Sequence, residues 1–458
     1  MEASAPSSAR SSRLRRLAFD RPNWPFAPAR LPVFYGWLII PVATVGVLFS
    51  APGQTIGVSV FTEDLMVTTG LTRVQISLTY LVGTLGGALL LPRAGRIYDR
   101  LGARTTTFLV GIAFGGALIL LSQIDVALCL LRTLPGVGAT PLYALISGFA
   151  LTSVGFFALR FLGQGVLSLA TSNMVMNWFD RRRGLANGFM GLLTSFGFSS
   201  APIVFNALIA AYTWKGAWLV LGLVTFTGLT LLSALLYRDN PEECGLRPDG
   251  GNSSTDAESR DDRPDYNLDR ARRTLPFWIF LASGIISSVF HTAVSFHVVS
   301  IYAEAGLDRD AAVEMFLPIA TIAVSINFIA GWLSDRTSLR GHLALYLAGI
   351  VVANIGMLNL QEPWGRPLLI AGMGTTGGLM RLLGSVTWPR YYGRRNLGAI
   401  RGFVMAIGVG ASAVGPTIFG LAYDLFDDYE VASWICITSA SVLIPLTPWA
   451  LEPPDRRR

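Results

Sequence analysis

The sequence predicts an all-α membrane protein with about twelve transmembrane helices, arranged as two pseudo-symmetric bundles of six. Three observations predict this class: the composition, the number of long apolar segments and an internal repeat. Of the 458 residues, 52% are hydrophobic and only 14% are charged, whereas a soluble domain carries about 25% charged residues. We therefore expect the lipid bilayer, rather than water, to surround most of the chain.

Twelve apolar segments, numbered here as spans in chain order, are long enough to cross about 30 Å of hydrocarbon. They lie near 35–59, 73–92, 105–123, 146–178, 184–211, 214–237, 275–303, 311–334, 341–360, 366–390, 398–426 and 430–450. Residues 238–274 are polar and aperiodic, which is typical of a disordered linker. The expected organisation is a disordered basic tail (1–34), an N-terminal bundle (35–237), the linker (238–274), a C-terminal bundle (275–451) and a second tail (452–458).

Arginine supplies nearly all the positive charge, because Lys215 is the single lysine in a chain of net charge +7. With twelve spans, the arginine clusters near residues 10–16, 93–104, 181–183, 336–340, 390–401 and 456–458 all fall on one side of the membrane. The positive-inside rule predicts that this side is the cytoplasm, with both termini there, in the inner or plasma membrane of the cell. Because the clusters separate apolar segments, nucleic acid is not an expected partner.

The two halves repeat at the level of single residues. Six positions of the fourth-to-fifth span region, among them Arg181, Gly184 and Pro202, recur 214 residues later as Arg395, Gly398 and Pro416. The loop after span 2 recurs at an offset of 236 residues. The difference places about 22 extra residues between spans 3 and 4, near 124–146, where we expect an extracellular hairpin or longer helices.

Residues 95–104, which read GRIYDRLGAR, resemble the GxxxDRxGxR loop signature of the major facilitator superfamily. A degenerate second copy, GWLSDR at 331–336, lies between spans 8 and 9. The resemblance implies a secondary transporter that works by alternating access. It also implies that these loops control the conformational change, through Gly95, Asp99, Arg100, Arg104, Gly331, Asp335 and Arg336.

The physical role of this loop follows from its residue types. Asp99 can accept hydrogen bonds from a helix N-terminus in the other half, expected near Gly398–Arg401, and so hold the cytoplasmic face shut in the outward-open state. Gly95 would let span 2 approach its neighbour closely. The alternative is that the loop arginines only set the topology.

The segments FYGW (34–37), WFDRRRGLA (178–186) and YYGRRNLG (391–398) look like the monocarboxylate and oxalate/formate transporter branch. Members of that branch typically carry a basic residue in span 8, or in span 1 or 11, for the substrate carboxylate. This chain departs from the pattern, because span 8 has no Lys or Arg before Arg336 and the cores of spans 1 and 11 have none.

Ionisable residues inside spans are functional hypotheses, because hydrocarbon makes them costly. Arg381 lies in span 10, about 18 Å from the cytoplasmic end, and Arg160 lies in span 4, about 27 Å from that end. Each can bind an anionic substrate bidentately, or can pair with a neighbouring carbonyl or carboxylate and hold helices together. Gln164, one turn beyond Arg160, and Gln54, in a kinked part of span 1, complete the candidate substrate site.

Two further residues are candidates for proton coupling. His291 in span 7 titrates near neutral pH and can carry a transported proton, or can simply be hydrogen-bonded. His297, six residues on, is expected to face elsewhere. Glu314, which opens span 8, is a candidate outer-gate or proton-site acid.

No enzyme, metal or cofactor motif is evident, and Cys129, Cys244 and Cys436 are isolated from one another in sequence. Transport would then be driven by proton symport or by exchange with a counter-anion. The leading hypothesis is a monomeric secondary transporter of a small organic anion such as a monocarboxylate or dicarboxylate. The alternatives are an exporter of drugs or metabolites and a non-transporting membrane sensor on the same scaffold.

Overall fold

The computed structural model describes residues 22–133, 140–179, 182–250, 265–334, 336–393 and 396–453. These residues are mostly helical and contain no strand. Eight helical segments are long and apolar enough to cross a membrane, and two of them, 73–121 and 188–236, each contain two crossings. With the short apolar helix of span 1 and the more polar helix of span 10, the described residues hold the twelve expected spans.

The first span is a broken helix rather than a continuous one. It consists of α1 (Gly36–Leu48), η3 (Ala51–Gly53), α2 (Thr55–Val58) and η4 (Ser59–Phe61), and it continues into α3 (Thr62–Thr69). Gln54 has an extended backbone at the break. The expected kink of span 1 is therefore present, and it separates the two ends of the span.

The other N-terminal spans occupy three long helical segments. α4 (Arg73–Leu121) holds spans 2 and 3, which meet at Gly102, where φ is +82°. Span 4 comprises α6 (Pro141–Ala158), the π-helix η5 (Leu159–Leu167) and α7 (Ser168–Trp178). α8 (Arg183–Val224) holds span 5 and the start of span 6, joined at Thr213, and span 6 continues through η6 (Thr225–Leu229) and α9 (Thr230–Leu236).

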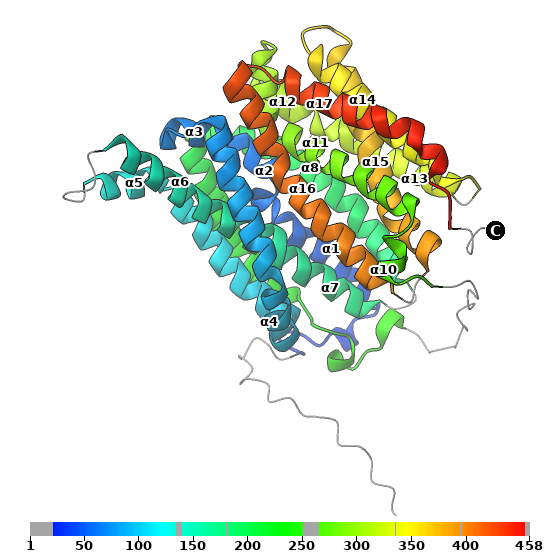
Figure 1. Cartoon of the computed structure of the whole chain (residues 1–458). Coiled ribbons are helices and arrows are strands. Elements are labelled where there is room, and N and C mark those ends of the chain that lie inside the picture. Colours follow the sequence, from blue (N-terminus) through cyan, green and yellow to red (C-terminus); the bar gives the residue numbers. More distant parts are fainter. Residues whose placement is uncertain are drawn as a thin grey trace, which may run out of the picture.

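The extra segment between spans 3 and 4 adds no thirteenth crossing in the residues described. It contains the short helix α5 (Ile124–Arg132) and lengthens span 4, which runs for 38 residues from Pro141 to Trp178. α5 and the start of α6 project sideways from the bundle (Figure 1). Of the two expected alternatives, a hairpin or longer helices, the described residues show a longer fourth span together with one short helix outside the spans.

The C-terminal half repeats the six-span plan. Its helices are α11 (Leu275–Glu304), α12 (Arg309–Glu314) with α13 (Phe316–Ser334), α14 (Leu339–Leu358), α15 (Gly365–Tyr392), α16 (Leu397–Phe426), and α17 (Glu430–Leu443) with η9 (Ile444–Trp449). One large apolar core fills this half, and two apolar cores fill the N-terminal half.

Both ends of the expected linker contact the bundles. On the N-terminal side η7 (Glu242–Cys244) and η8 (Pro248–Gly250) follow span 6, and the indole of Trp178 donates to the carbonyl of Arg238 at 2.9 Å. On the C-terminal side, α10 (Leu268–Ala271) is preceded by Tyr266, whose amide donates to the Tyr392 carbonyl at 2.9 Å. Residues 251–264 lie outside the described part of the chain.

The alternating spans give the molecule two ends. One end carries the turns at Gly102, Arg182, Arg336 and Gly393 and is called the arginine-rich end. The other carries α3, α12 and the turns that precede α15 and α17, and is called the opposite end. α3 and α12 lie at the top of Figure 1 and α10 lies below them, toward the arginine-rich end.

Candidate functional site

A cavity of about 800 Å³ lies against the C-terminal half, between α11, α14, α15 and α16. Its walls are mostly apolar, and its polar neutral groups are few. Two arginines, Arg381 and Arg401, line it, and none of its lining residues is an aspartate or a glutamate. No metal-binding cluster occurs among the residues that the structure describes. The cavity is thus suited to an anion with an apolar body.

Arg381 lies where the two halves meet over this cavity. Its Nη2 donates a hydrogen bond to the Oγ of Ser195, in α8 of the N-terminal half, at 3.3 Å. Its side chain is exposed to the cavity and has no carboxylate partner among the described residues. The sequence-based placement of Arg381 near the middle of span 10 is consistent with this position.

Arg401 was not among the predicted substrate residues. It lies four residues inside α16 and lines the same cavity, exposed and without a hydrogen bond or ion pair to any described residue. The sequence analysis counted it among the arginines that set the topology. The signal available in the sequence was its position one helical turn inside span 11 rather than before it.

Arg160 occupies a different environment, in the core of the N-terminal half. Its side chain is buried, with 5% of its surface exposed, and it does not line the cavity. The guanidinium donates to Gly53 O at 3.2 Å, to Thr55 Oγ1 at 3.3 Å and to Thr84 Oγ1 at 3.2 Å, and lies 4.9 Å from the centre of the Tyr80 ring. All of these partners are neutral, and two of them flank the break in span 1.

The two predicted glutamines do not join Arg160. Gln164 is exposed whereas Arg160 is buried, in a part of span 4 that is π-helical over residues 159–167. The two side chains therefore lie in different environments. Gln54 donates to Ser50 Oγ at 3.0 Å, within the same span.

The predicted proton-site residues lie apart from the cavity. His291 Nε2 is 2.6 Å from Thr376 Oγ1, so it links α11 to α15 inside the C-terminal half. Glu314 ends α12 at the opposite end, where it is exposed and pairs with Arg366 at 3.5 Å. Neither residue forms a hydrogen bond or ion pair with a described residue of the N-terminal half.

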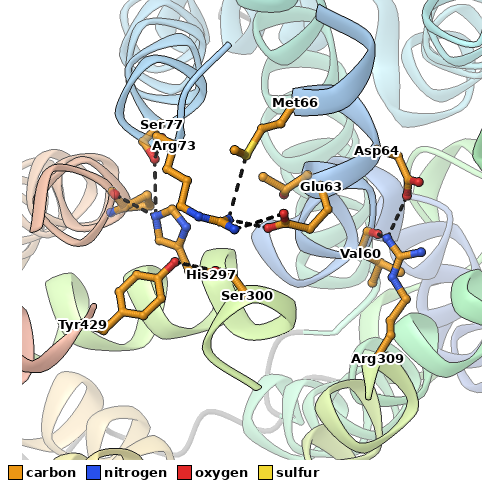
Figure 2. Close-up of polar contacts among 12 residues, drawn as sticks. Val60, Glu63, Asp64, Met66, Arg73, Ser77, His297, Ser300, Arg309 and Tyr429 are labelled. Atoms are coloured by element: carbon orange, nitrogen blue, oxygen red, sulfur yellow. Dashed lines mark hydrogen bonds and ion pairs between the residues drawn. The ribbon is translucent and has the colours of Figure 1, made fainter. Parts of the chain in front are cut away.

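Charged residues close the opposite end between the two halves. Arg309 of α12 donates to the Asp64 carboxylate and to the Val60 carbonyl, each at 2.7 Å (Figure 2). Beside it, Arg73 makes two hydrogen bonds, of 2.5 and 3.2 Å, to the Glu63 carboxylate. Two consecutive acids of α3 therefore hold one arginine from each half.

Asp424 of α16 adds a second link across this end. Its carboxylate accepts a hydrogen bond from Thr72 Oγ1 at 2.7 Å and from the Val74 amide at 3.3 Å, at the N-terminus of α4. A negative charge at a helix N-terminus is favourable. The Arg73 guanidinium also lies 4.5 Å from the centre of the Tyr423 ring. We call Glu63, Asp64, Arg73, Arg309 and Asp424 the outer gate.

His297, which was expected to face away from His291, has different partners from it and lies in the interface of the outer gate. Its Nε2 is 2.9 Å from the Pro416 carbonyl and 3.3 Å from Ser77 Oγ, and Figure 2 shows the ring between α4 and Tyr429. Tyr429 in turn donates to Ser300 Oγ at 2.8 Å. Sequence reasoning missed this role because the neighbours of His297 come from two other spans.

At the arginine-rich end, by contrast, Asp99 and Gly95 of the loop signature do not link the two halves in the described part of the chain. Asp99 and Arg100 are exposed, and Asp99 makes no hydrogen bond or ion pair with another described residue. A Cβ on Gly95 would have nothing within 4 Å, so the close approach expected there is absent in this conformation. The expected contact of Asp99 with residues 398–401 is absent as well.

Other residues of the loop signature make contacts within one half. Arg104 is buried, and its guanidinium donates to the carbonyls of Ala234 and Trp24, while its amide donates to Asp239 Oδ1 at 2.9 Å. Arg336 folds back on the carbonyl and ring of Trp332. A Cβ on Gly331 would meet only Leu382, at 4.0 Å, and Asp335 lies outside the described residues.

The geometry therefore defines a two-bundle membrane protein whose halves meet at one end around a charged gate. The cavity lies against one half and reaches Arg401 near the arginine-rich end, with Met405 of its lining 72% exposed. Two helical bundles related by a repeat, with a site near the middle of the membrane, are typical of secondary transporters.

A family model of the Major Facilitator Superfamily matches residues 42–416, and the chain belongs to this superfamily. The "MFS-type transporter 1" of Ophiocordyceps sp. (strain BCC 1869) is 34% identical over 79 residues. That match covers 16% of this chain and 18% of the relative, so the chain aligns with less than a fifth of the relative's length.

Solved structures of transporters share the fold. A bacterial homologue of the human lysosomal transporter Spinster, in an inward-facing and unoccupied conformation, has a TM-score of 0.64 at 12% identity, covering 93% of this chain and 99% of that one. The nucleoside transporter NupG has a TM-score of 0.64 at 12% identity, covering 90% and 98%. At these identities the likeness concerns the fold alone. The chain is accordingly a multi-pass membrane protein of the superfamily.

Proposed function

We propose that this chain is a secondary active transporter of a small organic anion, such as a monocarboxylate, by proton symport or by exchange with a counter-anion. The single observation that carries the proposal is the pair Arg381 and Arg401 in a cavity without any acidic lining residue. A guanidinium pairs with a carboxylate through two parallel hydrogen bonds. The apolar walls of the cavity would hold the organic part of the substrate.

Electrostatics supports an anion rather than a neutral substrate. A cation within a low-dielectric region is costly unless it is paired. Arg381 has only the neutral hydroxyl of Ser195 as a partner among the described residues. An anionic substrate would supply the missing charge, and it would sit where both halves can contact it.

Alternating access is the mechanism that fits this arrangement. By the positive-inside rule the arginine-rich end faces the cytoplasm, with both termini there, in the inner or plasma membrane. The conformation would then be open to the cytoplasm and closed outside by the outer gate. Asp99, Arg100 and the rest of the loop signature would engage the other half when the cytoplasmic face closes.

A second candidate, an exporter of drugs or metabolites, is favoured by the same apolar walls, since apolar groups line most of the cavity. The resemblance of residues 34–37, 178–186 and 391–398 to the monocarboxylate branch supports the anion instead. The arginines of spans 10 and 11 would then serve in place of the basic residue of span 8.

Uptake into proteoliposomes tests the proposal. Purified protein is reconstituted, and uptake of a panel of radiolabelled small carboxylates is measured with an inward proton gradient, or with a counter-anion trapped inside. We expect Arg381→Ala to reduce uptake at least about tenfold, since tenfold corresponds to only 1.4 kcal/mol. Arg381→Lys should retain part of the activity, because it keeps the charge and loses the planar fork.

Arg93→Ala is the matched control, because Arg93 is exposed, lies outside the cavity and forms no hydrogen bond or ion pair with a described residue. It should transport like the wild type. A wild-type protein that moves none of the carboxylates under either driving force would exclude the anion assignment. The exporter would then become the first candidate.

A further inference from the structure

His297 is buried at the boundary between the two halves, at the end that the outer gate closes. Its side chain belongs to α11, and 2% of its surface is exposed. Its Nε2 faces Pro416 O in α16 at 2.9 Å and Ser77 Oγ in α4 at 3.3 Å. The ring therefore touches both bundles, unlike His291, whose partner Thr376 lies in its own half.

The hydrogen bonds define where the proton sits on this imidazole. A carbonyl oxygen only accepts, so Nε2 donates to Pro416 O. The Ser77 hydroxyl donates to Arg73 O at 2.7 Å, so its oxygen can only accept from Nε2. Nδ1 is then the unprotonated nitrogen, and it is buried without a hydrogen-bond partner among the described residues.

The surroundings of the ring do not favour a second proton. The charged and titratable groups that face it are Arg73 from α4, Tyr423 and Asp424 from α16, and Tyr429 before α17, with Glu63 of α3 bound to Arg73. Asp424 is already engaged by Thr72 and Val74. A proton on Nδ1 would create a buried N–H with no acceptor beside the Arg73 cation, which is a costly arrangement.

We propose that His297 is the proton-binding group that couples protonation to opening of the outer gate. The closed gate holds the neutral imidazole, and a proton on Nδ1 is accommodated only when the halves separate and water reaches the ring. By linkage, acid then shifts the population toward the outward-open state. The inference rests on the proposed alternating access, and it assigns the coupling proton to span 7 at the gate rather than to His291.

A distance measurement across the gate tests this without a substrate. Spin labels are placed on the purified full-length protein at Val67→Cys in α3, where 87% of the side chain is exposed, and at Glu362→Cys, in the exposed turn before α15. The exposed Cys129 is replaced by Ser, while Cys244 and Cys436 are buried. Distance distributions are recorded by double electron–electron resonance between about pH 8 and pH 5, where histidine titrates.

We expect the wild type to show a longer-distance population that grows on acidification. His297→Gln keeps an N–H donor for Pro416 O but cannot take up a proton, so its distribution should not depend on pH. His291→Gln should behave like the wild type. Asp64→Asn weakens the ion pair with Arg309 and should increase the population with the longer distance at every pH. This variant is the control that tests whether the labels report gate opening.

Three results would overturn the inference. A His297→Gln protein that still opens with acid would exclude this residue as the sensor. Loss of the pH response in His291→Gln would move the role to that residue. A wild type that stays closed at every pH while Asp64→Asn opens would show that the gate moves without a proton, and the transport proposal would remain to be judged by uptake alone.

Discussion

At the scale of single residues, three arginines of similar appearance in the sequence have different roles in the structure. Arg160 is buried and donates only to neutral protein groups, whereas Arg381 and Arg401 are open to the cavity. The three arginines differ in burial and in hydrogen-bond partners, and neither property can be read from the sequence. The hydrogen bond from Arg160 to Gly53 O supports a carbonyl at the break in span 1, where the regular helical partner is missing.

Arg160→Met is predicted to destabilise the protein. The methionine fills part of the space but leaves the carbonyl of Gly53 and the hydroxyl of Thr84 without the donor that Arg160 supplies. Leaving a buried polar group without its hydrogen bond costs about 1–3 kcal/mol. Removing the buried charge of Arg160 offsets part of this cost. Thermal unfolding in detergent should show a lower midpoint.

The control for this prediction is Arg401→Met, since Arg401 is exposed and has no partner among the described residues. Its effect on stability should stay within about 0.5 kcal/mol. Equal midpoints for the two variants would contradict the structural role of Arg160 and return it to the substrate site.

At the scale of elements, the sequence predicts the helices well and their irregularities poorly. Hydrophobic length and arginine position are local properties, so all twelve spans could be located from them. The break at Gln54 could be suspected, but the π-helix at 159–167 could not, because such departures are stabilised by contacts between spans.

The candidate site was predictable only in part. An arginine in the middle of span 10 is conspicuous, and Arg381 does line the cavity. Arg401 was hidden among the loop arginines. His297 could not be assigned to the gate, because its partners Ser77 and Pro416 are 220 and 119 residues away in sequence.

The turn between spans 2 and 3 gives a prediction at this scale. Gly102 has φ +82° and ψ 173°, a region occupied almost only by glycine, and a side chain there would collide with the Asp239 carboxylate. Gly102→Ala should cost about 1–3 kcal/mol of stability. Gly95→Ala is the matched control, because Gly95 is helical and a Cβ added there would have nothing within 4 Å, so this substitution should not lower the unfolding midpoint.

A pH-dependent prediction concerns α5, which is outside the spans. The Lys215 ammonium holds the pKa of the Asp125 carboxyl below its ordinary value through a hydrogen bond and ion pair. A lowered folded-state pKa stabilises the fold above the unfolded value near 3.9 and ceases to do so as the pH falls through the folded value. Asp125→Asn should therefore cost under about 1 kcal/mol at neutral pH, because the two side chains are partly exposed, 43% for Lys215 and 35% for Asp125.

The same difference should shrink as the pH falls below about 3.9 and through the lowered folded-state pKa of Asp125, measured as the gap between the unfolding midpoints of the wild type and Asp125→Asn. Lys215→Gln should reproduce the neutral-pH loss, and combining both substitutions should add little. A gap that persists in acid would show that Asp125 acts through packing rather than charge.

At the scale of the whole molecule, the contacts between halves are unevenly distributed. The charged contacts between them gather at the outer gate, while Asp99 and Gly95 at the arginine-rich end meet nothing from the described part of the other half. Under the proposed alternating access, the gate contributes to the balance between the two access states. A change of 1.4 kcal/mol in that balance alters the population ratio tenfold.

The ion pair between Asp64 and Arg309 gives the last prediction. Arg309→Asp places two acids together and should shift the population away from the described state, whereas combining it with Asp64→Arg restores opposite charges and should reverse the shift.

The readout is labelling of Met405→Cys, a cavity-lining position 72% exposed, by a membrane-impermeant thiol reagent in the Cys129→Ser background. Inside-out vesicles should be labelled and right-side-out vesicles should not, if the arginine-rich end is cytoplasmic. Labelling in inside-out vesicles should fall in Arg309→Asp and recover in the charge-swapped protein. Equal labelling in all three proteins would mean that this pair closes the outer end without setting the balance, which would then depend on Asp424 and the buried contacts of His297.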